Sequence, residues 1–580
     1  MISVRKQRKQ WTEPTADAAS IRRFSQRLEV SEVVATLLWE RNQRDTSIAR
    51  DFLSPRLAGL DDPFAIENLK AVVSRIRKAL ERSESVVVFG DYDVDGVTST
   101  VLLMHILTRF GLKPASFVPH RLDEGYGLSV EALERVLESG KPDLLMAVDC
   151  GTNSREPVAF LRKQGIDVII LDHHASKEAL PDDCLLVNPH VHDAPDQPWT
   201  NLSAVGIVFK VVHGLLKELR AEGDDLAHEI QLKDFLDLVA LGTICDLVPL
   251  TGENRILARH GLRLIQKGQR IGICALMEAS GWRPGDEITP IDVSFRLGPR
   301  INASGRLADA SGPIELLLSE DWQFARTAAG ELDAFNRERQ AIEKVITATA
   351  TEMVENEFID QLGLVLHHPD WHSGVVGIVA SRISNRYHRP TLVLGAEGAE
   401  IKGSGRSIPG VNLVEVLQRC EQWLKRWGGH PMAVGMSTDP ELVEGLREAF
   451  NAALSEQFDK GLPDPILKVD CWVETSALSE ALLNELEQLE PFGQKNPEPV
   501  FALKNIRLRD FGPFGKGHLK FNIPGHNGNG TLSGVGWNRG ADLADPALAG
   551  PIDLACRFHW NHWNGRKEAR LTLVDWRPAR

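Results

Sequence analysis

The sequence predicts a multidomain α/β protein: a parallel-sheet domain, a long connecting helix, a smaller α/β domain and a C-terminal β-barrel. Three observations predict this fold class. Short apolar runs alternate with helical stretches from about residue 84 to 320, a proline-free stretch follows, and the end of the chain is rich in aromatic and β-forming residues. With 580 residues, 43% apolar and 25% charged, the chain is long enough for several domains.

The elements follow in order along the chain. Apolar runs such as "SVVVFGD", "LLMAVD" and "VIILDHH" are typical of buried parallel strands, whose carboxyl ends gather functional residues. Apolar residues recur at helical spacing in 315–358, which indicates one or two long helices. We expect an N-terminal extension, a catalytic domain, the connecting helix, a second α/β domain and an oligonucleotide-binding (OB) type barrel over 1–48, 49–314, 315–358, 359–462 and 463–580.

The charge of the chain is unevenly distributed. The net charge is −14, yet residues 501–580 hold twelve Lys/Arg against six Asp/Glu, and residues 1–27 hold seven cations against two anions. Local positive potential is enough for a phosphate-binding surface, so the net charge does not exclude nucleic acid. The sequence has no run of eighteen apolar residues, and its seven cysteines form no Cys-x-x-Cys pair. We therefore expect no membrane span and a location in the reducing cytoplasm.

Acidic residues stand at the ends of four apolar runs. Asp93 and Asp95 alternate after the first run, Asp149 ends the second, and Asp172-His173-His174 end the third. Asp246 ends a fourth run in "LDLVALGTICDLVPL", and we interpret all four runs as strands. A single aspartate at such a place is usually a helix cap or turn former, and Asp91 fits that reading.

Carboxylates brought together in this way repel one another and resist losing their hydration, so a positive charge has to meet them. Carboxylate oxygens with imidazole nitrogen suit Mn²⁺ or Mg²⁺. Two such ions, about 4 Å apart, lower the pKa of a water held between them and neutralise the oxygens of a phosphoryl group. The sequence therefore predicts two divalent cations at one edge of the sheet.

Several motifs make the resemblance specific. "DYDVDG", "VDCGT", "LDHHAS" and "GTICDLVPL" resemble, in order, the four motifs of the DHH phosphoesterase superfamily. "WHSGVVGIVASR", "GSGRS" and "GGHPMAVG" are similar to its associated DHHA1 domain. "LEPFGQKNPEPVF" and "GKGHLKF" resemble the final domain of the single-strand-specific 5′→3′ exonucleases within this superfamily. The resemblance covers roughly residues 50–580 and implies their fold and activity.

The resemblance also implies roles for individual residues. Asp93 and Asp149 would hold one metal ion, and a second would be held by Asp95, Asp149, His173 and Asp246. His174 would face the scissile phosphate, so the catalytic set is His174, Asp149 and Asp93, while Asp172 and Asp91 would orient their neighbours. Phe89 stands where many members of the superfamily have a histidine, so we expect the first metal site to be the weaker one.

Further residues are candidates for binding the DNA strand. By resemblance Arg121 would hold the 5′-terminal phosphate, and Ser404 and Arg406 lie on a glycine-rich stretch that can approach phosphate closely. "FRLGPRINASGRL" resembles the DNA-contacting segment of the family, although its arginines could instead pair with acidic residues; it contains Arg296, Arg300, Asn302 and Arg306. Lys516 and Lys520 lie among aromatic residues, a pattern that suits single-stranded nucleic acid.

These features favour a hydrolase that releases 5′-mononucleotides from single-stranded DNA in recombination and repair. Two alternatives stay open: a DHH phosphoesterase acting on a smaller substrate, and a catalytically inactive scaffold that keeps the fold to bind DNA or replication proteins. The scaffold is disfavoured because all five metal-ligand candidates are present, namely Asp93, Asp95, Asp149, His173 and Asp246. The family further implies single-strand-binding protein and repair helicases as partners, and we expect a monomer.

Overall fold

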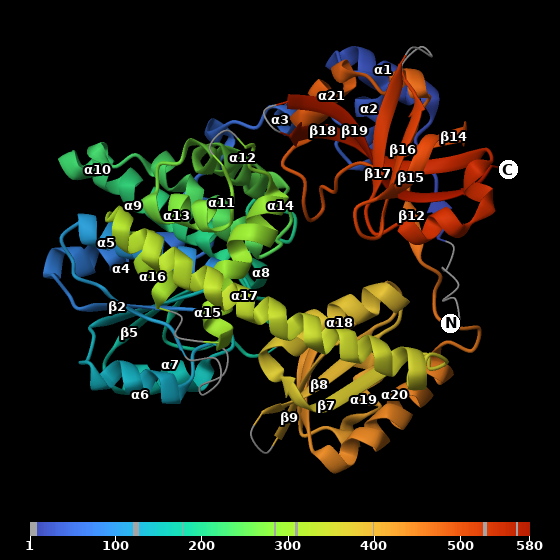
Figure 1. The fold of residues 1–580 in the computed structure, drawn as a ribbon. Helices are drawn as coiled ribbons and strands as arrows, with labels where there is room; N and C mark the ends of the chain where they lie inside the picture. The colour runs from blue at the N-terminus through green and yellow to red at the C-terminus, as the bar shows by residue number, and fades with distance from the viewer. Residues whose placement is uncertain are drawn as a thin grey trace. The chain divides into compact units, whose positions relative to one another are not determined.

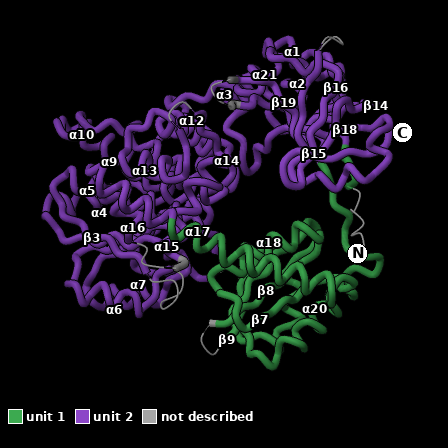
Figure 2. Tube along the Cα trace, in the orientation of Figure 1, with its two compact units in different colours: residues 1–12, 306–308, 334–467 green, residues 13–305, 309–333, 468–580 purple. Residues whose placement is uncertain are grey.

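The computed structural model describes residues 9–119, 127–176, 178–283, 286–307, 311–397, 400–525, 530–563 and 566–579. The chain forms two compact units (Figure 2). Unit 1 consists of residues 1–12, 306–308 and 334–467, and unit 2 of residues 13–305, 309–333 and 468–580. The long helix α17, Trp322–Met353, continues from the second unit into the first. Each unit is described by itself below.

Unit 2 contains the predicted parallel sheet, with the strand order β3-β2-β4-β5-β6 (Figure 1). All neighbouring strands pair in parallel. The strands are β2 Val86–Gly90, β3 Ala115–Phe117, β4 Leu144–Val148, β5 Asp167–Leu171 and β6 Leu185–Val187. Since β2, β4 and β5 are neighbours, their carboxyl ends lie side by side at one edge of the sheet.

Helices cover both faces of this sheet. Helices α6 (Val130–Glu138) and α7 (Arg155–Lys163) share a buried apolar core with one face, which includes Phe89, Ala147 and Ile170. The helices α4, Leu69–Arg82, and α5, Val94–Arg109, lie on the other side of the sheet in Figure 1. Near them a largely helical part follows, with α9 Ala204–Ala221, α11 Leu236–Cys245, α12 Gly252–Lys267, α13 Ile271–Ala279, α15 Gly298–Leu307 and α16 Gly312–Leu318.

The C-terminal part of unit 2 is a seven-stranded sheet in the order β13-β14-β18-β19-β17-β16-β15. Its strands are β13 Cys471–Trp472, β14 Phe501–Ile506, β15 Arg509–Phe514, β16 His518–Pro524, β17 Thr531–Gly536, β18 Ile552–Trp563 and β19 Arg566–Pro578. Strands β15 and β16 pair antiparallel and form a hairpin.

The N-terminal helices belong to the core of this C-terminal part, a long-range pairing that the sequence did not predict. Helices α1 (Ala18–Leu28), α2 (Glu32–Glu40) and α3 (Thr46–Leu53) pack their apolar residues against α21 (Glu480–Leu486) and the sheet. The buried Arg255 guanidinium on α12 donates to the carbonyl oxygens of Phe52, Gln488 and Leu489. Segments from the two ends of the chain are thus attached to the same surface of α12.

Unit 1 is a smaller α/β unit around a sheet in the order β10-β11-β9-β8-β7. Its strands are β7 Leu364–His372, β8 Thr391–Glu397, β9 Glu400–Arg406, β10 Arg426–His430 and β11 Ala433–Thr438. Helix α18, Ser373–Tyr387, and the end of α17 form one apolar core with the sheet. Helices α19, Leu413–Gln418, and α20, Val443–Gln457, form another.

The chain therefore has the predicted fold class, with two α/β sheets, a long helix and a C-terminal β-sheet part. The sequence assigned one or two helices to residues 315–358. In the structure the end of α16 and a short turn occupy the start of this stretch, and the long helix begins at Trp322. None of the helices in the described part of the chain combines the length and apolar character that crossing a membrane requires.

A buried ion pair beside the sheet gives a test of this packing. The Lys210 ammonium on α9 lies 2.8 Å from a Glu253 carboxylate oxygen on α12, and both side chains are buried. Lys210→Met leaves the Glu253 charge buried without its cation, so we expect a loss of about 3–5 kcal/mol in the free energy of unfolding. Urea denaturation measures this loss.

Lys217→Met is the matched control, because Lys217 lies on the same helix and pairs with Asp62 at the surface. Its effect should stay below about 1 kcal/mol, the usual value of an exposed pair. Equal losses in the two variants would contradict the assigned role of the buried pair.

Candidate metal centre

The loop after β2 places two carboxylates by ordinary helix capping. Asp93 is the N-cap of α5, and its Oδ1 accepts hydrogen bonds from the backbone N–H groups of Asp95 and Gly96. Gly96 is required here, since a Cβ atom would lie 2.5 Å from the Asp91 carbonyl oxygen. A carboxylate has two oxygens, so capping by Oδ1 is compatible with a second contact by Asp93, which lies in a set with Asp91 and Asp149.

Asp95 is fully buried at the start of α5. Its carboxylate accepts hydrogen bonds from the backbone N–H groups of Ala204, at 2.6 Å, and Val205, at 2.9 Å, which begin helix α9. The positive end of the α9 dipole therefore stabilises the Asp95 carboxylate. Gly242 makes room for it, because a Cβ atom there would lie 2.8 Å from Asp95 Oδ1.

Asp149 and the Asp172-His173-His174 group follow the neighbouring strands β4 and β5. Asp149 has a left-handed backbone, with φ of 62°, which turns the chain sharply at the end of the strand. Asp172 is buried and accepts hydrogen bonds from the backbone N–H groups of His173 and His174 and from the His174 Nδ1 atom at 2.7 Å. Asp172 thus holds the loop and the ring of His174 by hydrogen bonds.

The sequence interpretation was wrong about the element that carries Asp246. The apolar run before it is the helix α11, not a strand, and Asp246 is its C-cap. Periodicity cannot separate the two, because a helix that is buried on all sides is as continuously apolar as a central strand. The residue itself nevertheless reaches the cluster, since its Oδ2 lies 3.5 Å from His173 Nε2.

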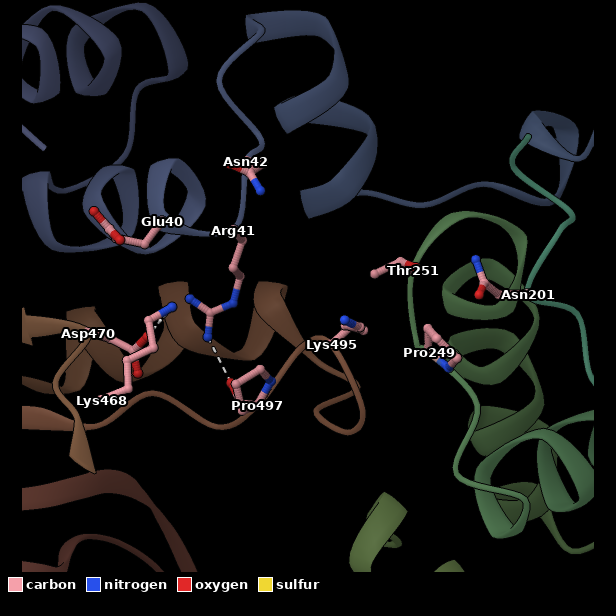
Figure 3. A pocket seen from close by; sticks show the side chains of 10 residues that line it. All are labelled: Glu40, Arg41, Asn42, Asn201, Pro249, Thr251, Lys468, Asp470, Lys495 and Pro497. Atoms are coloured by element: carbon pink, nitrogen blue, oxygen red, sulfur yellow. Dashed lines mark hydrogen bonds and ion pairs between the residues drawn. The ribbon is translucent and has the colours of Figure 1, made fainter. Parts of the chain in front are cut away.

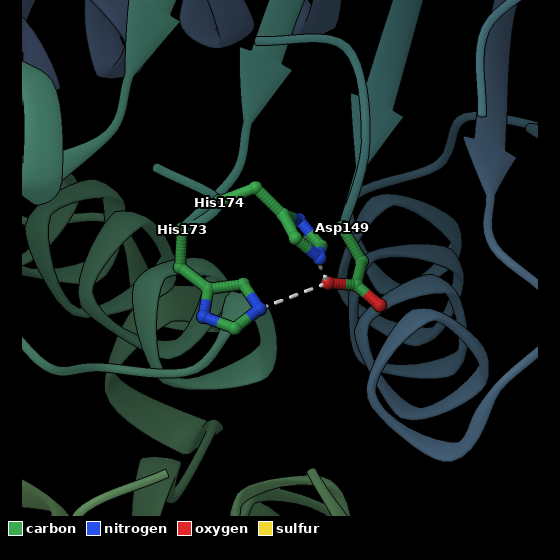
Figure 4. A group of neighbouring side chains, drawn as sticks. All are labelled: Asp149, His173 and His174. Atoms are coloured by element: carbon green, nitrogen blue, oxygen red, sulfur yellow. Dashed lines mark ion pairs between the residues drawn. The ribbon is translucent and has the colours of Figure 1, made fainter. Parts of the chain in front are cut away.

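The structure brings the predicted ligands together at one point. His173 Nε2 lies 3.3 Å from Asp149 Oδ1 and 3.9 Å from Asp95 Oδ2, and Figure 4 shows both histidine rings turned toward Asp149. Three sets of side chains offer atoms within 4.8 Å of one another: Asp149, His173 and His174; Asp95, His173 and Asp246; and Asp91, Asp93 and Asp149. Asp149 and His173 each belong to two sets, which suits ligands near two neighbouring ions.

The donor set fits the expected metals. Asp149 Oδ1 and His173 Nε2 are buried and have no hydrogen-bond partner among the described residues. Two ligands, each about 2.1 Å from an ion at a right angle, stand about 3 Å apart, close to the distance between these two atoms. Oxygen-rich sites with an imidazole suit Mn²⁺ and Mg²⁺. Asp91 also falls within ligand distance of Asp93 and Asp149, a position that the sequence interpretation did not give it.

Burial and mutual repulsion raise the pKa values of the clustered carboxyl groups. Burial, followed by the charge of Asp93, raises the pKa of Asp95 to about 7. Burial and then the charges of Asp95 and Asp93 raise the pKa of Asp246 to about 9, and the same causes raise the pKa of Asp149 well above its usual range. Without a metal ion, these carboxyl groups therefore tend to keep their protons, which a bound cation would replace.

The two histidines differ in their charge. Burial and the charge of His174 lower the pKa of His173 to about 4, so its ring is neutral at pH 7 and can act as a ligand. Burial lowers the pKa of His174 as well, but the hydrogen bond to Asp172 and the charge of Asp172 outweigh it and raise this pKa to about 9. The His174 side chain is 41% exposed, whereas that of His173 is 10% exposed. His174 is therefore an accessible imidazolium beside the neutral imidazole of His173.

A supporting residue was missed by the sequence interpretation. The Asn188 amide donates hydrogen bonds to the His174 carbonyl oxygen, at 2.9 Å, and to the Thr152 hydroxyl, at 2.8 Å. It holds the histidine loop against the loop after β4. Asn188 directly follows β6, so the rule that functional residues gather at strand ends would have found it.

The remaining candidates of the first domain have mixed outcomes. Arg300 forms a salt bridge of 2.8 Å with Asp333, and Arg296 one of 3.1 Å with Asp292, so the structure provides the acidic partners that the sequence left open. The Asn302 Oδ1 atom is buried without a hydrogen-bond partner among the described residues. Arg121 and the Arg306 side chain lie outside the described residues. Phe89 is buried and stacks on Phe117, with ring centroids 5.3 Å apart.

In unit 1, Ser404 and Arg406 lie on β9 of the sheet. The Arg406 guanidinium donates to the Ser404 hydroxyl and to the Gly405 carbonyl oxygen, each at 2.8 Å. Burial alone lowers its pKa. Within the described part of the chain no carboxylate shifts that pKa upward, so the charge of Arg406 is compatible with binding a phosphate group.

In the C-terminal part, Lys516 and Lys520 are exposed on the β15–β16 hairpin. Three aromatic rings gather beside them at the surface. His518 lies 5.0 Å from Trp537 and 6.4 Å from Phe514, and Phe514 lies 6.1 Å from Trp537, measured between ring centroids. Phe521, by contrast, is buried in the core. The rings of Phe514, His518 and Trp537, called the hairpin aromatics below, are thus accessible near both lysines.

A separate pocket of about 360 Å³ lies elsewhere in unit 2 (Figure 3). Its lining residues are Glu40, Arg41, Asn42, Asn201, Pro249, Thr251, Lys468, Asp470, Lys495 and Pro497, and they include none of the clustered carboxylates. Arg41 already donates to Asn496, Leu37 and Pro497. The pocket is therefore a gap where the N-terminal helix α2 packs against the loops around it.

Comparisons with known proteins agree with these features. Residues 85–243, 357–456 and 469–575 match the family models described as the N-terminal domain of the DHH family, the DHHA1 domain and the RecJ OB domain. The single-stranded-DNA-specific exonuclease RecJ of Bacillus subtilis (strain 168) is 36% identical over 570 residues, which cover 97% of this chain and 70% of that protein. RecJ of Escherichia coli (strain K12) is 34% identical over 522 residues, 88% and 90% of the two chains.

Solved structures support the same family assignment. RecJ from Thermus thermophilus in complex with Mn²⁺ matches with a TM-score of 0.82 and 30% identity, over 98% of this chain and 79% of that one. Its complex with Mg²⁺ matches with a TM-score of 0.76 and 29% identity, over 98% and 78%. Similarity along nearly the whole length shows that the chain belongs to the RecJ family of single-stranded-DNA-specific exonucleases.

Proposed function

We propose that this chain is a metal-dependent exonuclease that hydrolyses single-stranded DNA from its 5′ end and releases 5′-mononucleotides. We also propose that it serves DNA recombination and repair, as the family resemblance implies. The observation that carries the proposal is the convergence of acidic and histidine side chains from β2, β4, β5 and α11 on one point. A separate surface with lysines and exposed rings suits a polymeric substrate.

We assign the ligands as the family pattern implies. Asp93 and Asp149 would hold one divalent cation, and Asp95, Asp149, His173 and Asp246 the other, an assignment supported by the overlapping sets around Asp149 and His173. When bound, the cations supply a water of lowered pKa and neutralise the oxygens of the scissile phosphate. Asp149, which would be the shared ligand, is buried.

His174 would stabilise the charge that develops on the scissile phosphate. Its Nδ1–H donates to Asp172, so its Nε2–H on the other side of the ring is the donor for a phosphate oxygen. The salt-bridging Asp172 keeps the ring oriented and, by raising its pKa, protonated. The chain thus positions one proton donor and one neutral ligand on adjacent residues.

The strand itself would be bound by residues outside the metal centre. We propose that Arg121, Ser404, Arg406, Asn302 and Arg306 contact its phosphate groups, and that Lys516 and Lys520 follow the backbone while the hairpin aromatics stack on bases. Arg300 would have to share its guanidinium between Asp333 and DNA. We retain the domain limits proposed from the sequence, and single-strand-binding protein and repair helicases remain the partners that the family implies.

Digestion of end-labelled substrates tests the proposed function. With Mn²⁺, the protein should release 5′-mononucleotides from a 5′-labelled single strand and leave a matched blunt duplex intact. Asp149→Asn should reduce kcat by at least about a thousandfold, because removal of a shared ligand disables both sites. Asp182→Asn, an exposed aspartate of the same domain, is the control and should retain full activity. Digestion from the 3′ end, or cleavage of only dinucleotides, would contradict the proposal.

The pKa shifts predict a pH-dependent effect of metal on stability. Because the pKa values of Asp95 and Asp246 are raised in the folded chain, the stability they contribute without metal is lost as the pH rises toward 7 and 9. At high pH fewer of these carboxyl groups are protonated, so a metal ion displaces fewer protons when it binds. The increase in Tm caused by Mn²⁺ should therefore be larger at about pH 8.5 than at about pH 6.

Differential scanning fluorimetry with and without Mn²⁺ measures this effect. Asp95→Asn removes one titrating ligand and should shrink both the Tm increase and its pH dependence. An increase in Tm that is independent of pH in the unmodified chain would show that proton release is not linked to metal binding.

We expect the loss of a hairpin aromatic to change only the affinity for single-stranded DNA. Trp537→Ala should weaken binding of single-stranded DNA by about 1–3 kcal/mol, since one stacking surface is lost. Fluorescence anisotropy without divalent cations measures the Kd in the absence of cleavage. Trp322→Ala is the control, because Trp322 is also exposed but lies at the start of α17. Equal Kd values for the two variants would remove the hairpin aromatics from the binding surface.

A further inference from the structure

An apolar patch is exposed beside the metal centre. It consists of three side chains, Leu247, Ile291 and Phe295, which are 63%, 60% and 72% exposed. Phe295 is the most exposed large apolar side chain of the described residues. Large apolar side chains exposed on neighbouring segments indicate a binding site, because their exposure to water is unfavourable.

Contacts place the patch at the end of helix α11. Leu247 directly follows Asp246, the C-cap of that helix and a member of the metal cluster. The segment that carries Ile291 and Phe295 packs on the same helix end. The Ser294 hydroxyl donates to the Ile244 carbonyl oxygen at 3.3 Å, and the Cys245 thiol donates to the Val293 carbonyl oxygen at 3.6 Å. The apolar patch therefore lies on two segments that meet at the end of α11, where Asp246 joins the metal cluster.

The segment is held firmly although its aromatic ring is exposed. Thr289 and Asp292 form a reciprocal capping box, and Arg296 bridges Asp292 at 3.1 Å and donates to the Ser280 carbonyl oxygen. Residues Val293–Leu297 form a π-helical turn, a feature that is frequent at functional sites. The constrained backbone fixes where the Phe295 side chain starts, which lowers the entropy cost of binding.

Leu247 is presented at a conformational cost. Its backbone is left-handed, with φ of 59°, although leucine rarely adopts that conformation. The turn exposes its side chain instead of burying it in the apolar surroundings of α11. Strain that exposes an apolar side chain next to a cluster of carboxylates is unfavourable for stability alone, so it indicates a ligand that is charged on one side and apolar on the other.

We propose that Phe295, supported by Leu247, stacks against the nucleobase of a nucleotide next to the scissile phosphate. A nucleotide has the required chemistry, since its phosphate matches the metal cluster and the face of its base matches an aromatic ring. In a duplex that base is held in the stack by its pairing partner and must be unpaired to reach the ring, so this contact favours single strands. The inference rests on the proposed function and adds a positioning residue to it.

Digestion of strands with and without bases tests this role. The substrates are a single strand and the same strand with abasic nucleotides at its first three positions. The unmodified chain should show a kcat/KM about 5-fold to 100-fold lower on the abasic strand, the range expected for one stacking contact. Phe295→Ala should lower kcat/KM on the complete strand by a similar factor and lose most of the discrimination. Phe295→Trp should restore both kcat/KM and the discrimination between the two strands.

The control is Phe324→Ala, which removes an exposed phenylalanine from α17 of the same unit and should discriminate like the parent chain. The Mn²⁺-induced rise in Tm shows that Phe295→Ala retains the metal centre. The inference would be overturned if Phe295→Ala still discriminated between the complete and the abasic strand. It would also be overturned if Phe295→Ala digested both strands like the parent chain but changed its oligomeric state, as measured by light scattering. If the parent chain digests neither strand, the proposed function fails, an outcome distinct from these.

Discussion

The structure depends on a repulsion that the protein alone does not resolve. The buried Asp95 and Asp149 and the partly buried Asp246 bring three carboxyl groups together around the His173 ring. Ionised carboxylates are costly to bury unless they are paired with positive charge. The chain supplies part of that charge as the N-terminal dipole of α9, which donates two backbone hydrogen bonds to Asp95. Protons or divalent cations must supply the rest.

The parallel sheet explains how residues so distant in sequence meet. Strands β2, β4 and β5 are neighbours in the sheet, so the loops after them stand side by side. Each loop then uses a different local device to aim its side chain: a helix cap at Asp93, a left-handed turn at Asp149, and an aspartate that binds the next two backbone N–H groups at Asp172. The cluster is therefore precise because the backbone of each loop fixes the side chain that the loop carries.

The sequence predicts the part of the site that is encoded locally. Acidic residues at the ends of apolar runs were enough to find Asp93, Asp95, Asp149 and His173, because a buried strand and the turn after it are both visible in a short window. Asp246 was found, but its helix was taken for a strand, since a helix buried on all sides has no polar face to reveal its period. Local pattern thus identifies a residue more readily than the element that carries it. Features that depend on distant contacts were not accessible in this way: nothing in residues 18–53 indicates that they complete the core of a sheet more than four hundred residues later.

The distribution of polar and apolar surface around the cluster follows from the same constraint. A group of carboxylates that is ready for cations must stay clear of competing cations of the protein, and the nearby arginines Arg296 and Arg300 are indeed held by their own acidic partners. Leu247, which directly follows Asp246, is exposed, and so is Phe295 on the segment that packs on the same helix end. An apolar border neither competes for the metal ligands nor neutralises an approaching phosphate, so it preserves the electrostatic attraction that the cations provide.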